Sequence, residues 1–177
     1  MKLLAFAATN SLNSMNKKLV VHAADLMKSF EPSLSVDLID LNDYEMPIYR
    51  PDREKENGIP QLANTFYNKV SEADKVLISF AEYNGNYTAA YKNIFDWVSR
   101  IDQQLYQKKP VFVMAASPGK RGGAGVLKIV TEAAPYFGMD LKGSFSLPMF
   151  RENFDQDSNQ IKNAELAKQL ADLLKSF

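Results

Sequence analysis

Hydroxyl and amide side chains cluster directly after the first apolar segment of the chain, residues 3–8. Thr9, Ser11, Ser14 and Asn16 precede a segment with helical periodicity, so they should lie beside the free amides at the start of a helix. Hydroxyls, backbone amides and the positive end of a helix together favour an anion such as phosphate. The alternative is helix capping alone, for which Ser and Asn are well suited. Because these residues exceed what a cap requires, we predict an anion site.

The stretch from residue 82 to 87 reads Glu-Tyr-Asn-Gly-Asn-Tyr and follows an apolar segment that is typical of a buried strand. Its composition suits a planar heterocycle: backbone groups can bond the edge of a ring, Gly85 permits a close approach of the backbone, and Tyr83 and Tyr87 offer flat faces. Asn and Gly are also ordinary turn residues. On this stretch alone, a ring site and a simple strand-to-helix turn both remain open.

A third loop is rich in glycine and runs from residue 117 to 125 as Ser-Pro-Gly-Lys-Arg-Gly-Gly-Ala-Gly. Such a loop brings the backbone close to a ligand, although a turn with solvated Lys120 and Arg121 is the alternative. Taken together, the three loops indicate a phosphate pocket, a ring edge and a ring wall. This combination is typical of a site for a mononucleotide with a flat heterocycle.

Apolar segments alternate with helical patterns along the whole chain. The expected strands are 3–8, 35–41, 76–81, 109–116 and 140–147, and the expected helices are 17–30, 59–73, 89–100, 126–137 and 161–177. The apolar face of the first helix comprises Leu19, Ala23, Leu26, Met27 and Phe30, and that of the second comprises Leu62, Phe66 and Val70. Residues 42–58 should be irregular, as a functional loop, or as a solvated excursion or subunit contact.

This regular alternation predicts one α/β domain spanning residues 1–177, with a parallel sheet covered by helices on both faces and right-handed crossovers. Five strands match the flavodoxin-like three-layer arrangement with strand order 2-1-3-4-5. The loops after strands one, three and four then emerge at the carboxyl edge of the sheet, where such folds bind ligands. These are the three loops with unusual chemistry.

The composition excludes several classes of protein. Lys plus Arg and Asp plus Glu both number 21, so there is no basic excess of the kind that nucleic-acid binding favours. The absence of cysteine excludes thiolate chemistry, and the single histidine, His22, argues against a metal site built from several histidines. No apolar stretch approaches the length of a membrane span, and the first one is too short for a signal peptide. We therefore expect a cytoplasmic protein without a metal.

The segment from residue 82 to 100 resembles the signature of the NADPH-dependent FMN reductases, Pro-Glu-Tyr-Asn-Gly-Ser followed by Leu-Lys-Asn-Ala-Ile-Asp-Trp-Leu-Ser-Arg. The loop at 117–123 resembles their Ser-x-Gly-x-x-Gly-Gly. The first loop resembles Gly-Ser-Leu-Arg-x-x-Ser-x-Asn, but residues 8–11 read Ala-Thr-Asn-Ser, so the arginine is missing. Ala81 and Asn86 replace the usual proline and serine.

The resemblance implies bound FMN that takes a hydride from NADPH or NADH and passes it to a quinone, azo dye, chromate or free flavin. By the same resemblance, Thr9, Ser11, Ser14 and Asn16 hold the phosphate; Glu82, Tyr83, Asn84, Gly85 and Asn86 line the isoalloxazine; and Ser117 and Gly119 close its other side. No side chain is assigned as a catalyst. We expect Glu82 to face solvent or cap the following helix. A homodimer or homotetramer is also implied. Trp97 is expected in the core or at the subunit interface, and the resemblance favours the interface.

Loss of the arginine, which can pair with a phosphate dianion, predicts weaker FMN binding than is usual in the family. It also leaves open a second class of function. In this alternative, the chain is a flavin-binding or cofactor-free carrier or regulator on the same fold, without activity toward a nicotinamide.

Overall fold

A computed structural model describes all residues from Met1 to Phe177. Its main sheet contains five parallel strands in the order β2-β1-β3-β4-β5. The strands are β1 (Lys2–Ala8), β2 (Ser35–Ile39), β3 (Lys75–Phe80), β4 (Lys109–Ala116) and β5 (Met139–Leu147). The predicted flavodoxin-like order is therefore confirmed.

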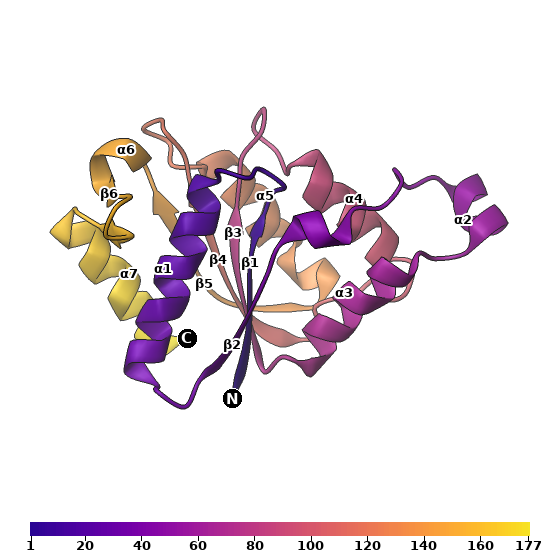
Figure 1. The fold of residues 1–177 in the computed structure, drawn as a ribbon, viewed down its shortest axis with the longest axis horizontal. Coiled ribbons are helices and arrows are strands. Elements are labelled where there is room, and N and C mark those ends of the chain that lie inside the picture. Colours follow the sequence, from indigo (N-terminus) through magenta and orange to yellow (C-terminus); the bar gives the residue numbers. More distant parts are fainter.

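Helices cover both faces of the sheet, so the molecule has three layers (Figure 1). The helices α1 (Met15–Phe30) and α7 (Ala164–Ser176) pack on one face, and α3 (Gln61–Glu72), α4 (Ala89–Val98) and α5 (Ala124–Ala133) pack on the other. Alternate residues of β1 enter the two cores: Leu4 and Phe6 join one, and Leu3 and Ala5 join the other. A strand buried on both faces is apolar throughout, which explains the continuous apolar runs in the sequence.

The segment between β2 and α3 is more regular than predicted. It contains a 3-10 turn, η1 (Leu41–Tyr44), and a short helix, α2 (Pro51–Asn57). The Asp40 side chain accepts a hydrogen bond from the amide of Asn42 and so starts η1, which also ends β2 at Ile39 rather than at residue 41. Pro51 fits the first turn of α2 because proline has no amide hydrogen to satisfy there.

The carboxyl-terminal third also departs from the expected boundaries. Pro135 lies in a 3-10 turn, η2 (Ala134–Phe137), so α5 ends at Ala133. A short helix, α6 (Phe150–Asn153), and a small antiparallel pair, β6 (Phe154–Asp155) with β7 (Gln160–Ile161), precede α7. The last helix begins at Ala164 because Asn163 caps it.

Two assignments of single side chains were wrong, and a third favoured the wrong one of two alternatives. Phe30 and Leu62, expected on buried helix faces, are 40% and 37% exposed. Trp97, expected in the core or at a subunit interface with the interface favoured, is only 1% exposed and belongs to the core of the protomer. None of the helices combines the length and the apolar character that crossing a membrane requires.

Candidate functional site

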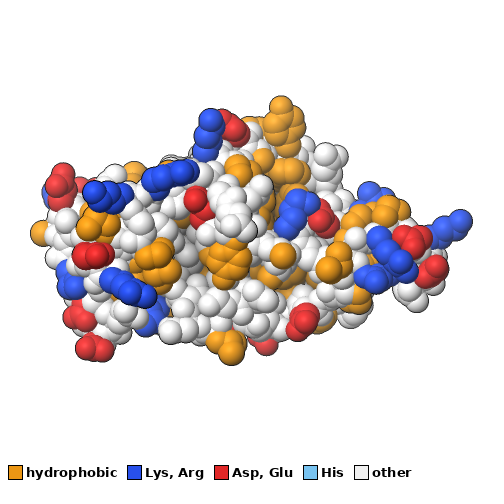
Figure 2. Space-filling view, turned by 90° about the horizontal axis from the view of Figure 1, so that it is seen from above, with side chains coloured by type: hydrophobic (Ala, Val, Ile, Leu, Met, Phe, Trp, Pro, Cys, Tyr) orange, Lys and Arg blue, Asp and Glu red, His pale blue; other side chains and the backbone are white.

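The three loops that carry the predicted site meet at one edge of the sheet, at the top of Figure 1. The strand register explains why. Ala8 at the end of β1 pairs with Phe80 at the end of β3, and Phe80 pairs with Ala115 of β4. The chain therefore leaves the sheet at the same level after all three strands. Figure 2, which looks down onto this edge, shows hydrophobic side chains in its middle and charged side chains of both signs around them.

The loop after β1 offers donors of the kind that hold a phosphate. The hydroxyl of Ser14 accepts a hydrogen bond from the amide of Lys17 at 3.2 Å and so caps α1. Thr9, which is buried, accepts a hydrogen bond from the amide of Ser11 at 3.2 Å. The amides of Leu12 and Asn13 make no backbone hydrogen bond within the protein, and the first amides of any helix lack intrahelical acceptors. These donors fit an anion.

Asn16 has a different role from the one implied by the resemblance. Its side chain is 3% exposed and points into the fold. The side-chain oxygen accepts hydrogen bonds from the hydroxyl of Ser79 and the amide of Ala116, both at 2.8 Å, and the side-chain nitrogen donates to the carbonyl of Ala116 at 3.2 Å. The side chain thus ties α1 to β3 and β4, and only its backbone amide is left to face a ligand.

Neither lysine at the start of α1 replaces the missing arginine. The Lys17 ammonium contacts the Asp40 carboxylate, and the Lys18 ammonium donates to the side chain of Gln156 at 2.5 Å. Burial by itself would raise the pKa of Asp40, but hydrogen bonds from Lys17 and Asn42 outweigh burial and hold this pKa below its ordinary value. The charge of Lys17 is therefore already balanced within the protein.

The loop after β3 is a miniature hairpin. Tyr83 and Asn86 exchange two backbone hydrogen bonds of 3.0 and 3.1 Å. The residues between them, Asn84 and Gly85, have φ angles of 53° and 76°, as in a two-residue turn with left-handed backbone at both positions. The turn alternative thus explains the Asn-Gly pair, and the hairpin places Tyr83, 48% exposed, at the sheet edge.

The tyrosine that follows the hairpin is a packing residue. The ring of Tyr87 lies 5.7 Å from that of Phe80 and 5.2 Å from that of Tyr91, measured between centroids. Burial raises the pKa of Tyr87 to about 12, so its phenol stays neutral at physiological pH. Thr88 closes the loop, because its hydroxyl donates to the carbonyl of Ala8 at 3.0 Å and caps α4. Sequence patterns did not single out Thr88.

We expected Glu82 to face solvent or to cap the following helix, and the structure shows neither. Its carboxylate accepts a hydrogen bond of 2.8 Å from the amide of Val126, in the first turn of α5, one helix further along the chain. Gly125 leaves room for this contact, because a Cβ at that position would lie 2.7 Å from the Glu82 oxygen. The contact joins the hairpin after β3 to the end of the glycine-rich loop.

We predict that Glu82→Ala lowers the free energy of unfolding by about 1–2 kcal/mol, the usual cost of losing a charged helix cap, and weakens FMN binding severalfold by releasing the hairpin. Thermal unfolding and a fluorescence titration with FMN measure the two effects. Glu82→Gln keeps an acceptor oxygen and should stay close to the unaltered protein in both. Equal losses of FMN affinity in both variants, with stability unchanged, would instead mean that the carboxylate contacts the flavin.

The glycine-rich loop is anchored to the segment after β5. The amide of Met149 donates to the carbonyl of Gly119, and the amide of Phe150 donates to that of Ser117, both at 3.0 Å. The hydroxyl of Ser146 donates to the carbonyl of Gly122, also at 3.0 Å. These contacts hold Ser117 and Gly119 at the sheet edge. The same loop is also joined to the hairpin after β3, through the hydrogen bond between Glu82 and Val126.

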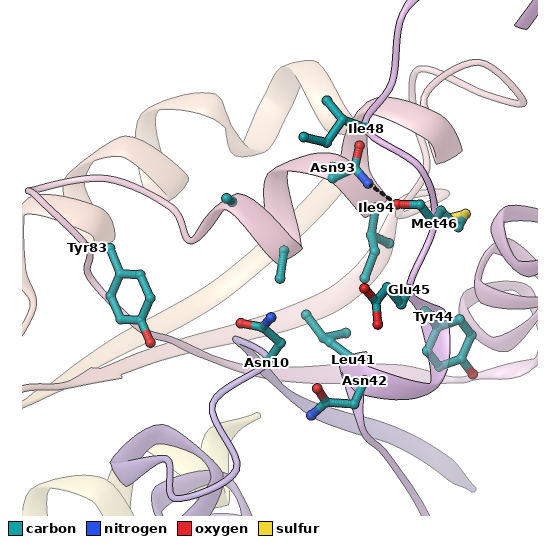
Figure 3. A pocket seen from close by; sticks show the side chains of 12 residues that line it. Asn10, Leu41, Asn42, Tyr44, Glu45, Met46, Ile48, Tyr83, Asn93 and Ile94 are labelled. Carbon is teal, nitrogen blue, oxygen red and sulfur yellow. Dashed lines mark hydrogen bonds between the residues drawn. The ribbon is translucent and has the colours of Figure 1, made fainter. Parts of the chain in front are cut away.

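A pocket of about 250 Å³ opens next to these loops (Figure 3). Asn10 from the first loop and Tyr83 from the hairpin line it, opposite residues of the segment 41–48 and of α4. The segment 41–48 is held in place by α4: Asn93 donates to the carbonyl of Met46 at 2.9 Å, and the indole of Trp97 donates to that of Pro47 at 2.7 Å. The first part of the segment 42–58 therefore borders a pocket beside the loops of the predicted site.

Comparisons with known proteins place the chain in a family. The family model of the NADPH-dependent FMN reductases matches residues 1–152. An NADPH:quinone oxidoreductase of Arabidopsis thaliana is 28% identical over 170 residues, which cover 93% of this chain and 85% of that protein. An NAD(P)H-dependent FMN reductase of Pseudomonas aeruginosa is 29% identical over 123 residues, which cover 70% and 63%.

Among solved structures, FerB of Paracoccus denitrificans, described as a flavoenzyme NAD(P)H:(acceptor) oxidoreductase, superposes with a TM-score of 0.74 at 22% identity and covers 99% of this chain and 93% of its own. At this identity the likeness shows the fold. Since the family model spans most of the chain, the chain belongs to the NADPH-dependent FMN reductase family and is an oxidoreductase with FMN as cofactor and NAD(P)H as reductant.

Proposed function

We propose that this protein uses bound FMN to pass a hydride from NADPH or NADH to a small-molecule acceptor such as a quinone, an azo dye, chromate or free flavin. The observation that carries the proposal is the meeting of the anion-binding loop, the hairpin and the glycine-rich loop at one sheet edge. FMN supplies the redox chemistry, and the protein supplies orientation and electrostatics. The whole chain, residues 1–177, acts as one flavin-binding domain in this proposal.

Each loop has its own part in the proposed site. The hydroxyls of Thr9, Ser11 and Ser14 and the amides at the start of α1, including that of Asn16, bind the phosphate. The hairpin residues Tyr83, Asn84, Gly85 and Asn86 line the ring, with Glu82 behind them. Ser117 and Gly119 border the other side. Backbone amides of the hairpin stabilise negative charge near the ring by fixed dipoles, so no side chain is needed as an acid or base.

The test is an absorbance spectrum of the purified protein, recorded without oxygen, before and after addition of FMN and then of NADPH or NADH. A flavin band that bleaches with either nicotinamide supports the reductase. Bound flavin that neither nicotinamide reduces supports the carrier function instead. Absence of flavin uptake would mean that loss of the phosphate-loop arginine, without a lysine to replace it, has removed FMN binding.

Assembly remains part of the proposal. We expect a homodimer or homotetramer in the cytoplasm, and sedimentation or light scattering measures the oligomeric state directly. Trp97 cannot form the interface because it is buried in the protomer. The exposed apolar side chains Leu12 and Tyr136 are better candidates, since they are 87% and 72% exposed and do not line the pocket.

A further inference from the structure

The pocket beside the hairpin has a wall that hydrogen bonds within the protein hold in place. Its outer wall, the segment 41–48, is fixed to α4 because Asn93 and Trp97 donate to the carbonyls of Met46 and Pro47. Asn93 also accepts a hydrogen bond of 2.8 Å from the amide of Tyr49. Two backbone groups of the wall and one group directly after it are thus bound to one helix. A wall held in this way keeps the shape of the pocket, as expected for a binding site.

The lining of the pocket is mostly apolar and carries a single charge. Eight of its twelve residues are hydrophobic. Glu45 is the only lining residue that is charged at neutral pH, because no aspartate, lysine, arginine or histidine lines the pocket. Figure 3 shows the Glu45 side chain directed toward the space between Leu41 and Ile94.

The carboxylate of Glu45 has no partner that would balance its charge. It forms no salt bridge, whereas the neighbouring acids Asp40 and Glu54 are paired with Lys17 and Arg100. The nearby Arg53 guanidinium is directed to the backbone carbonyl of Ile48 and does not line the pocket. Glu45 therefore places an unpaired negative charge at the open side of the pocket, where solvent and salt screen it in part.

We propose that this pocket receives the electron acceptor, and that Glu45 makes it selective for uncharged planar acceptors over anionic ones. This inference rests on the proposed reductase function. Tyr83 supports it, because this tyrosine belongs both to the hairpin that borders the proposed flavin ring and to the pocket wall. An uncharged quinone ring fits between the apolar walls, with a few amides at its edge. Chromate or a sulfonated ring would instead be repelled by the Glu45 carboxylate, because no cation in the pocket offsets that repulsion.

The overall reaction balances with a quinone as acceptor. NADPH, one proton and the quinone give NADP⁺ and the hydroquinone, so that two electrons and two protons are transferred. The second proton comes from water. Glu45 acts as a specificity residue in this scheme and takes part in no proton transfer.

The test uses two naphthoquinones that share one ring system, the uncharged 2-methyl compound and a 2-sulfonate, with chromate as a second anion. The FMN-loaded protein and the variants Glu45→Gln and Glu45→Lys are compared by kcat/KM with NADPH. We expect Glu45→Gln to raise kcat/KM for both anions about fivefold and Glu45→Lys to raise it about tenfold or more, whereas the value for the uncharged quinone changes less than twofold.

Asp43 provides a matched control. It lies two residues away in η1, is exposed, forms no salt bridge and does not line the pocket. Asp43→Asn removes the same charge and should leave the anionic acceptors unaffected. Glu45 is itself exposed and unpaired, so its variants should fold normally.

The outcomes separate this inference from the proposed function. If neither NADPH nor NADH bleaches the flavin, or no acceptor is reduced, the reductase proposal fails. If the uncharged quinone is reduced but the preference over the sulfonate is absent, or stays the same in both Glu45 variants, the reductase stands and the selectivity of Glu45 is refuted. Equal effects of Asp43→Asn and Glu45→Gln would show long-range steering instead of a local pocket.

Discussion

Replacement of Asn16 by alanine is expected to lower the free energy of unfolding by about 3–5 kcal/mol, because each buried polar group left without a partner costs about 1–3 kcal/mol. The variant leaves the hydroxyl of Ser79 and the amide and carbonyl of Ala116 without their side-chain partner. Alanine cannot reach these groups, and the site is buried. Urea denaturation followed by circular dichroism measures the change.

Asn13 is the matched control, since it is an exposed asparagine of the same loop. Asn13→Ala should change the free energy of unfolding by less than about 0.5 kcal/mol, as is usual for surface substitutions. If Asn16→Ala proves as stable as the unaltered protein and loses only FMN affinity, the Asn16 side chain serves the phosphate and not the fold. Such a result would restore the role that the family resemblance gave it.

The contrast between Asn16 and Ser14 shows what a sequence can predict about such a site. Both belong to the polar stretch 9–16 of the sequence, and both were predicted to hold a phosphate. Ser14 caps the helix that follows it, a local arrangement that a sequence pattern reveals. Asn16 bonds to Ala116, which is 100 residues away. A partner so distant in the chain is set by the packing of α1 on the sheet, which no local pattern encodes.

Glu82 and the segment 41–48 follow the same logic. Periodicity predicted the alternating strands and helices. The match of five such strands to the flavodoxin-like order then placed the three loops together. The attachment of Glu82 to Val126 requires α5 to begin directly beside the hairpin. The wall at 41–48 requires Asn93 and Trp97, two residues of the recognised motif, to bond backbone carbonyls. The sequence motif contains Asn93 and Trp97, but only the fold shows which backbone carbonyls they bond.

The second large effect is expected at Gly122. A Cβ at this position would lie 2.1 Å from the hydroxyl of Ser146 and 2.9 Å from the backbone nitrogen of Pro148, and the φ angle of 58° is unfavourable for any other residue. Left-handed backbone costs about 1–2 kcal/mol for a residue with a Cβ, and overpacking adds about 1–3 kcal/mol. We therefore expect Gly122→Ala to lose about 2–5 kcal/mol of stability and, with the loop displaced, most of its FMN affinity.

Gly119 lies in the same loop but has room for a side chain. Its φ is not left-handed, and the nearest atom to an added Cβ would be the Ser117 hydroxyl at 4.0 Å. The melting temperature of Gly119→Ala should therefore lie within about 1 °C of that of the unaltered protein. A change below about 0.2 kcal/mol in the free energy of unfolding shifts the melting temperature by less than about 1 °C. Any fall in its FMN affinity must then come from the cofactor itself. A tenfold loss with unchanged stability would place the flavin against Gly119, whereas unchanged affinity would remove Gly119 from the proposed site and leave the hairpin as the main wall of the ring.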